Sequence, residues 1–307
     1  MDETYKKELE KQQYRFIGDH SAVKVCSWTK KALTGQGHCY KQKFYGIESH
    51  RCCQISVTVN YCDQDCIFCW RKRYQEPFTT VDDPKKLVDN AIAQHSLLLS
   101  GMGGHENINR KKLEEAKDPN QFAISLTGET LHYPRLSELI RELKRRGCSS
   151  FVVTNGQLPE VMERMEPPSQ LYISLDAPNE DIYRKVCRPM NNDGWQRLNR
   201  SLEVLKDLRK KTRTTIRVTL VKGENMAEPE NYAKLIEKAE PHFLEVKAYM
   251  FVGNSRLKLS IKNMPRHHEI VEFAKDLEKH SRYRIIDEQP ESRVVLMMKD
   301  DNKRFLK

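Results

Sequence analysis

The sequence predicts an α/β protein built around a parallel β-sheet. Apolar runs rich in β-branched residues alternate about six times with helical patterns, and such alternation is typical of parallel βα units joined by right-handed crossovers. The runs are almost continuously apolar, as expected for strands buried on both faces. Six units form either a partial barrel or a doubly wound sheet, because a closed eight-stranded barrel typically needs about 250 residues and the alternating region is shorter.

The expected elements follow one another regularly. Six strands are expected at Ile55–Asn60, Phe122–Thr127, Phe151–Thr154, Leu171–Leu175, Ile216–Val221 and Leu244–Met250. Leucines at helical spacing predict helices over 136–143 and 198–208, and Pro84 behind an aspartate cap predicts another over 84–99. The remaining expectations are a charged surface helix within 1–20, an insertion or mobile loop over 101–120, a helix near 265–280 and a last strand at Arg293–Met297.

The chain divides into three expected parts. Residues 1–52 form an N-terminal extension that carries cysteines, and residues 53–250 form the α/β core. Residues 251–307 form a C-terminal extension that packs on this core.

The charge balance narrows the possible partners. Lys and Arg number 53 against 43 Asp and Glu, a net charge of +10, which fits a nucleic-acid partner. Hydrophobic residues make up 38% of the 307-residue chain, enough for a sizeable core. No apolar run approaches the roughly 18–20 residues of a bilayer span, and the first twenty residues lack the apolar stretch of a secretory signal. We therefore expect a soluble, cytoplasmic protein with no membrane partner.

Cysteines are concentrated near the N-terminus, where seven of the nine lie between residues 26 and 69. In a reducing compartment, clustered cysteines are more often metal ligands or catalytic thiols than disulfides. Cys62, Cys66 and Cys69 form a C-x3-C-x2-C pattern after the first expected strand, at the edge of a parallel sheet where ligands bind. Zinc normally takes four ligands, whereas three thiolates in one loop suit a 4Fe-4S cluster with one open iron. A zinc knuckle or reactive thiols are the alternatives.

The pattern, with Phe68 before its last cysteine, resembles the signature of radical S-adenosylmethionine (SAM) enzymes. This resemblance implies a partial (βα)6 barrel with N- and C-terminal extensions. It also implies that Cys62, Cys66 and Cys69 hold a 4Fe-4S cluster whose open iron chelates SAM. Reductive cleavage of SAM then gives a 5′-deoxyadenosyl radical.

Polar residues at the ends of the later strands supply the expected SAM contacts. Ser125–Glu129 resembles the Gly-Gly-Glu motif of the family, with Thr127 in place of the first glycine. Taken alone, each of these segments also fits an ordinary strand-ending turn. The implied SAM-binding residues are Gly128, Glu129, Thr154, Asn155, Ser174 and Asp176.

A second set of cysteines precedes the first strand. Cys26, Cys39 and Cys52 are separated by twelve residues on each side, and they are candidates for a second 4Fe-4S cluster. Neighbouring basic residues favour thiolates and hence metal binding, although three buried core cysteines are the alternative. Cys53 should face away from Cys52, because successive strand residues point to opposite faces. A pocket shared by both clusters requires a short first strand, since ten extended residues span about 33 Å.

Much of the chain resembles the stand-alone archaeal tRNA 4-demethylwyosine synthases. The resemblance rests on the upstream cysteines, on C-Y-K-x-K-F-Y-G-I at 39–47, on C-x-F-C-W-R at 66–71, on S-L-T-G-E and on Val218–Gly223. It implies that N1-methylguanosine beside the anticodon of tRNA-Phe condenses with pyruvate. The eukaryotic members carry an added flavodoxin-like domain for which this chain lacks the length, so an external electron donor of ferredoxin or flavodoxin type is implied. We expect a monomer.

Pyruvate must be held beside the N-methyl group that loses a hydrogen atom. One device is a Schiff base on a lysine, for which Lys41 is the first candidate and Lys43 the second. Chelation by the open iron of the second cluster is the other device. The alternative for both lysines is solvated or phosphate-contacting charge.

Basic runs and aromatic residues are the expected tRNA contacts, because a base modified in a folded tRNA must be flipped out and stacked. The run 71–73 lies beside the cluster loop and is favoured for phosphate, and the C-terminal extension is a further candidate surface. The stacking candidates are Trp28, Tyr40, Tyr45 and Trp70. The competing hypotheses are a zinc-stabilised nucleic-acid-binding module without catalysis and a radical SAM enzyme that acts on another substrate. Cys148 and Cys187 are expected core residues.

Overall fold

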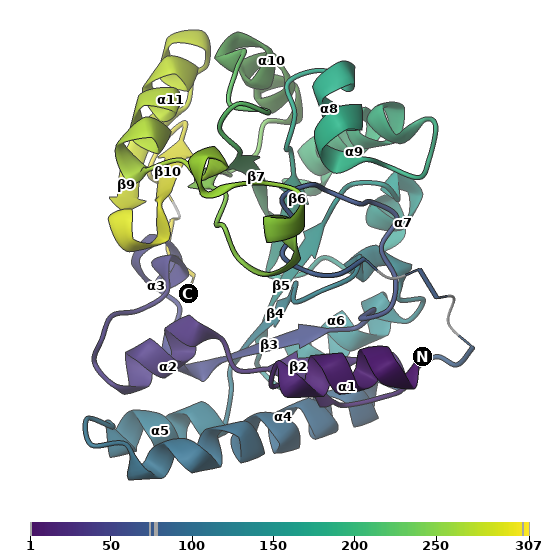
Figure 1. Cartoon of the computed structure of the whole chain (residues 1–307), viewed down its shortest axis with the longest axis vertical. Helices are drawn as coiled ribbons and strands as arrows, with labels where there is room; N and C mark the ends of the chain where they lie inside the picture. The colour runs from purple at the N-terminus through teal and green to yellow at the C-terminus, as the bar shows by residue number, and fades with distance from the viewer. Residues whose placement is uncertain (1, 74, 77–78, 303, 307) are drawn as a thin grey trace.

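The computed structural model describes residues 2–73, 75–76, 79–302 and 304–306 as one mixed sheet wrapped by helices (Figure 1). Its ten strands follow the order β1-β2-β3-β4-β5-β6-β7-β8-β10-β9, and the two edge strands are not hydrogen-bonded to each other. The sheet is therefore an open, partial barrel. This confirms the α/β fold class that the sequence predicts.

The six central strands are parallel and correspond to the six expected apolar runs. They are β3 (Cys52–Ser56), β4 (Gln121–Ile124), β5 (Ser149–Thr154), β6 (Gln170–Ser174), β7 (Arg213–Leu220) and β8 (Phe243–Ala248). Antiparallel strands extend both edges: β1 (Arg15–Phe16), β2 (Ala22–Lys24), β9 (Arg284–Gln289) and β10 (Val294–Met298). Both terminal extensions thus add strands to the core sheet.

Helices cover the outside of the sheet (Figure 1). They are α4 (Pro84–Ser100), α6 (Leu136–Arg145), α7 (Pro159–Arg164), α8 (Glu180–Cys187), α9 (Gly194–Leu208), α10 (Pro229–Ala239) and α11 (His267–His280). The start of α4 agrees with the expected cap, since Asp83 accepts hydrogen bonds from the backbone N–H groups of Lys85 and Lys86. None of the described helices combines the length and the apolar character that a bilayer crossing requires.

The N-terminal extension supplies α1 (Glu3–Lys11), α2 (Ser27–Leu33) and α3 (Tyr40–Tyr45), and in Figure 1 α2 and α3 lie between the start of β3 and the β9–β10 edge. Short 3-10 turns lie at η1 (Ser49–Arg51), η2 (Gly101–Gly104), η3 (Thr130–His132), η4 (Gly253–Leu257), η5 (Ile261–Asn263) and η6 (Pro290–Ser292). Aromatic side chains of α3 pack with Phe151, Tyr172 and Phe243 inside the barrel. This aromatic cluster forms part of the barrel interior.

One expected loop is instead partly helical. Within 101–120, α5 (Arg110–Lys117) begins behind Asn109, whose side chain accepts a hydrogen bond from the backbone N–H of Lys112 at 2.9 Å. Its buried Leu113 and Ala116 pack against the α2 and α4 side. The helix is strongly polar, so its two apolar positions gave too weak a periodic signal to be recognised.

Candidate active site

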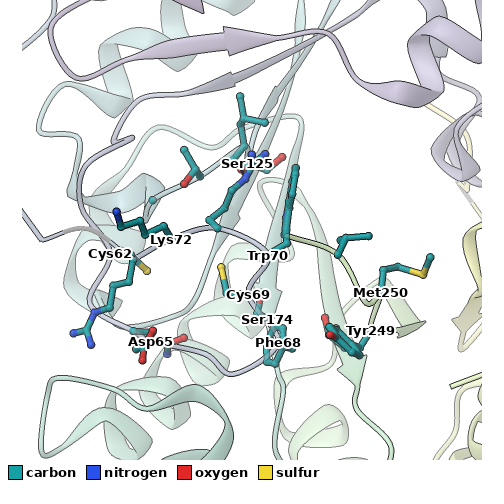
Figure 2. Close-up of a pocket in the computed structure, with 18 of the residues that line it drawn as sticks. Cys62, Asp65, Phe68, Cys69, Trp70, Lys72, Ser125, Ser174, Tyr249 and Met250 are labelled. Atoms are coloured by element: carbon teal, nitrogen blue, oxygen red, sulfur yellow. Dashed lines mark hydrogen bonds between the residues drawn. The ribbon is translucent and has the colours of Figure 1, made fainter. Parts of the chain in front are cut away.

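A cavity of about 500 Å³ opens where the parallel strands end, and Figure 2 shows the sulfur atoms of Cys62 and Cys69 among its lining side chains. Its walls come from the cysteine loop, the β4 end, and strands β6 to β8. The lining residues include Cys62, Cys69, Trp70, Arg71, Thr127, Gly128, Ser174, Arg217, Thr219, Lys247, Tyr249 and Met250. The chemistry-bearing loop and the strand ends therefore meet in one space, as a parallel α/β fold requires.

The thiols of Cys62, Cys66 and Cys69 are half-buried in the loop after β3. Burial is the main cause that raises the pKa of Cys69 to about 11, and the neighbouring Cys66 raises it further. A metal centre would reverse this effect, because ligation requires the deprotonated thiolate. In the described chain no group of three His, Cys, Asp or Glu side chains is arranged around a single-ion site. Thiolates of a cubane bind different irons and need not converge on one point, so the three cysteines suit a cluster.

Cys66 points partly away from the cavity. Its thiol lies 3.2 Å from Oε1 of Gln64 and is hydrogen-bonded to the Cys187 thiol at the end of α8, which raises its pKa. Cys187 is buried in the core, as expected from the sequence. Burial raises the pKa values of the Cys62 and Cys69 thiols, and the Cys66 thiol raises them further, so the three thiols lie close to one another.

Gly128 occupies a conformation that only glycine tolerates here. Its φ is +73°, and a Cβ at this position would lie 1.6 Å from the carbonyl oxygen of Thr58. The β4 end therefore packs directly on the strand end that leads to the cysteine loop. Gly128 and Ser174 both line the cavity, and their contact with SAM stays a prediction.

The other four expected SAM residues lie behind the cavity wall. Glu129 accepts hydrogen bonds from the backbone N–H of Asn155 at 2.8 Å and of Leu131 at 3.1 Å. Burial, followed by the charge of Asp63, raises the pKa of Glu129 to about 7. The Asn155 amide donates to Asp63, next to Cys62, at 2.6 Å. These contacts brace the loop that carries Cys62.

Thr154 and Asp176 are also occupied by protein contacts. The Thr154 hydroxyl accepts from the backbone N–H of Gly156 at 3.0 Å. The Asp176 carboxylate accepts from the backbone N–H of Thr219 at 2.7 Å, and burial raises its pKa to about 7. Direct contact of these two residues with SAM stays a prediction.

The second cysteine set converges at the start of β3. Cys26 and Cys39 occupy the N-cap positions of α2 and α3, and neither thiol caps its helix. Burial and the nearby Cys26 raise the pKa of Cys39 to about 11. Burial also raises the pKa of Cys52 to about 12, and both Cys26 and Cys39 contribute to that increase. The three thiols therefore lie within electrostatic reach of one another. Cys53 faces the opposite side, in the core beneath the helices, as strand alternation predicts.

The structure separates the two candidate lysines of α3. Lys41 is 9% exposed, and its Nζ lies 4.6 Å from the ring centres of both Phe151 and Tyr172. Burial and the charge of Arg217 lower its pKa. The Lys43 side chain is 43% exposed and pairs with Asp287 at 2.8 Å. Lys41 thus has the desolvated environment that activates a lysine amine, whereas Lys43 is a surface ion pair.

A polar cluster beside Lys41 was not foreseen from the sequence. Glu245 is fully buried and accepts hydrogen bonds from the hydroxyls of Tyr40 at 3.0 Å and Tyr45 at 2.7 Å. The Arg217 guanidinium donates to Glu245 at 2.9 Å and to the Tyr40 hydroxyl at 2.9 Å. Arg217, Glu245 and Lys247 are charged residues inside otherwise apolar buried strands, and this was the signal that could have identified them.

The same contacts reduce the set of stacking candidates. Tyr40 and Tyr45 are buried with their hydroxyls on Glu245, so they cannot stack on a tRNA base in this arrangement. Trp70 is 43% exposed at the cavity. Arg71, expected to contact phosphate at the surface, is only 7% exposed, and its Nε donates to the Leu126 carbonyl at 3.1 Å. Its two Nη groups have no hydrogen-bond partner among the described residues.

Comparisons with known proteins agree with this site. Residues 56–236 match the radical SAM superfamily model, and residues 238–299 match a model for wyosine base formation. The S-adenosyl-L-methionine-dependent tRNA 4-demethylwyosine synthase of Pyrococcus abyssi is 49% identical over 97% of this chain and 91% of its own length. This chain belongs to the tRNA 4-demethylwyosine synthase family. The family member from Methanocaldococcus jannaschii is 40% identical over 96% of both chains.

Solved structures of the family share the whole fold. A structure of TYW1 with a lysine-pyruvate adduct bound has a TM-score of 0.89 and 39% identity, and the match covers 100% of this chain and 98% of that one. A crystal structure of archaeal TYW1 has a TM-score of 0.82 and 35% identity over 100% of both chains. As a 4-demethylwyosine synthase, the chain is a radical SAM enzyme, and this family uses SAM and a 4Fe-4S cluster.

Proposed function

We propose that this enzyme condenses N1-methylguanosine beside the anticodon of tRNA-Phe with pyruvate to form the tricyclic 4-demethylwyosine base. The observation that carries this proposal is the position of Lys41, buried between aromatic rings. It lies near Arg217, which lines the same cavity as Cys62 and Cys69. The cysteines proposed to hold the radical-generating cluster and the amine of Lys41 therefore belong to the same barrel interior. The family's solved TYW1 structure with a lysine-pyruvate adduct supports the same chemistry.

Cys62, Cys66 and Cys69 hold the SAM-binding 4Fe-4S cluster in this proposal. When bound, the cluster and SAM supply the 5′-deoxyadenosyl radical that removes a hydrogen atom from the N-methyl group. Gly128 and Ser174 contact SAM at the cavity wall, while Glu129, Thr154, Asn155 and Asp176 hold the strand ends and the cysteine loop in place. An external donor of ferredoxin or flavodoxin type supplies the electron for cleavage.

Lys41 holds pyruvate as a Schiff base. Its neutral amine attacks the carbonyl carbon, a C–N bond forms, and the carbonyl oxygen leaves as water. The lowered pKa of Lys41 increases the neutral fraction of the amine near neutral pH. The buried position between rings keeps water away from the linkage.

Cys26, Cys39 and Cys52 hold a second 4Fe-4S cluster. The mutual electrostatic effects of their thiols and the short strand β3 (Cys52–Ser56) support this assignment. Iron and sulfide analysis of anaerobically reconstituted protein should give about twice the content of a variant in which these three residues are serine. Equal contents would refute the second cluster.

The tRNA binds over the cavity mouth. Trp70 is exposed there for stacking, and Lys72, two residues further along the chain, is exposed beside it. The division at residues 52 and 250, a cytoplasmic location and a monomeric state stay predictions.

Borohydride trapping tests the Schiff base. The reconstituted protein is incubated with pyruvate and sodium cyanoborohydride, digested, and mapped by mass spectrometry. The wild type and Lys43→Met should carry the reduced pyruvate adduct on Lys41, and Lys41→Met should carry none. Lys43 lies on the same short helix and serves as the matched control. An adduct on Lys43 or on another lysine would contradict the assignment.

A further inference from the structure

Two charged side chains of the cavity wall have no assigned part in the reaction. Arg217 and Lys247 both line the cavity that contains Cys62 and Cys69. Lys41 is not among the lining residues, but Arg217 lies within electrostatic reach of it. In the β7–β8 ladder Arg217 is opposite Glu245, and Thr219 is opposite Lys247. Alternate residues of a strand share one face, so these four side chains project together into the barrel interior.

Lys247 is a cation without an anionic partner. Its Nζ donates to the carbonyl oxygen of Ser292 at 2.6 Å and lies 5.5 Å from the Tyr40 ring centre. Within the described ranges no carboxylate forms an ion pair with it, because Glu245 is already bonded to Arg217 and two tyrosine hydroxyls. Burial and the neighbouring Arg217 lower the pKa of Lys247 to about 8, so the amine is still mostly charged at pH 7. Lys247 is half-buried, and a partly desolvated charge of this kind is favoured by an accompanying anion.

Arg217 adds a second positive group on the Lys41 side. Its guanidinium carbon lies 4.7 Å from the Tyr172 ring centre, and the Lys41 Nζ lies 4.6 Å from the same centre. Two of its nitrogens are used by Glu245 and Tyr40. The remaining Nη1 forms no hydrogen bond with any part of the chain that the structure describes. A small anion attached to Lys41 would therefore lie within reach of the positive charge of Arg217.

We propose that Lys247 and Arg217 bind the carboxylate of the 2-oxo acid whose carbonyl carbon reacts with Lys41, and thereby select a 2-oxo acid over an uncharged ketone. The inference rests on the proposed Schiff base. Lys247 is the principal determinant, because no carboxylate of the described residues pairs with its charge, whereas Arg217 is held in place by Glu245. Both are positioning residues: they orient the substrate and form no covalent bond with it.

Competition between a charged and an uncharged substrate tests the inference. Trapping on Lys41 is measured against concentration for pyruvate and for pyruvamide, which keeps the ketone and lacks the carboxylate. The wild type should reach half-maximal trapping at a much lower concentration of pyruvate than of pyruvamide. In Lys247→Met this preference should fall about 10- to 100-fold, the range that a charge-assisted hydrogen bond provides. Lys247→Arg should restore part of it.

Lys299→Met is the matched control. Lys299 follows β10 and pairs with Glu237 at 3.3 Å outside the cavity, so its loss should leave the pyruvate preference unchanged. Circular dichroism and iron content verify that each variant is folded and loaded. An unchanged preference in folded Lys247→Met, or an adduct on Lys247 itself, would overturn the inference.

A second measurement separates this inference from the proposed Schiff base. Equilibrium dialysis with radiolabelled pyruvate needs no covalent bond, and Lys247→Met should weaken the retained binding by a similar factor in a Lys41→Met background. If the wild type traps no pyruvate on Lys41, the Schiff-base proposal fails, and the dialysis result still decides the carboxylate site. Undiminished pyruvate binding in that background would overturn the carboxylate site alone.

Discussion

Replacement of Gly128 by alanine should destabilise the protein and its cluster loop together. A Cβ at Gly128 would have to move from 1.6 Å to at least 3.0 Å from the Thr58 carbonyl oxygen. That movement strains two hydrogen bonds, from the Thr58 hydroxyl to the Glu129 carbonyl (2.9 Å) and from the Glu129 N–H to the Tyr61 carbonyl (2.8 Å). Each is worth about 1 kcal/mol, and the left-handed φ costs an alanine about 1–2 kcal/mol. The expected loss in the free energy of unfolding is about 3–4 kcal/mol.

Gly147→Ala is the matched control. Gly147 has a φ of +71° and no heavy atom within 4 Å of a built Cβ, so its alanine variant carries the conformational cost without the collision. Differential scanning fluorimetry should show Tm losses of ~2–3 °C for Gly147→Ala and of ~5–6 °C for Gly128→Ala. Because Tyr61 directly precedes Cys62, Gly128→Ala should also retain less iron after reconstitution. Equal Tm losses in the two variants would refute the close-packing argument.

Three further predictions concern stability, pH and tRNA binding. Tyr45→Phe removes a 2.7 Å hydrogen bond to buried Glu245 and should lower the free energy of unfolding, measured in urea, by about 1–3 kcal/mol. An unchanged urea midpoint would contradict this prediction. Since burial raises the pKa of Asp176 from 3.8 to about 7, its ionisation is less favourable in the folded state. The free energy of unfolding should therefore fall from about pH 4 to pH 7, by up to about 4 kcal/mol, and Asp176→Asn should flatten this slope; equal slopes would disprove the burial effect. Trp70→Ala should weaken tRNA binding by about 1–3 kcal/mol with little change in Tm, as measured by fluorescence anisotropy, and an unaltered Kd would exclude stacking on Trp70.

Apolar runs and helix-capping residues in the sequence were enough to predict most of the fold. The six parallel strands were readable because each is an apolar run of about one strand's length, and α4 was readable from its proline and aspartate cap. The edge strands β1 and β2 span only two and three residues, too short for a period-2 pattern to be recognised. Helix α5 was missed because most of its residues are charged.

The sequence predicted some of the cavity-lining residues and not others. Gly128 and Ser174 line the cavity as expected, whereas Asp176 faces the backbone of the neighbouring strand. The sequence places all three at strand ends, but which side chain reaches the cavity depends on the twist of the strands and on backbone donors from the next one. Which backbone N–H groups can donate depends on how neighbouring strands pair, and the sequence of one strand does not specify that pairing.

The sequence by itself determined the cysteine loop, because three thiols within eight residues must lie close together however the rest of the chain folds. It also determined the alternation of strands and helices. Only the tertiary structure distinguished Lys41 from Lys43 and brought Tyr40 to Glu245, which is 205 residues away along the chain. Such contacts exist only after the sheet has curved and α3 has packed into it, since burial and charge pairing across that distance are properties of the assembled interior.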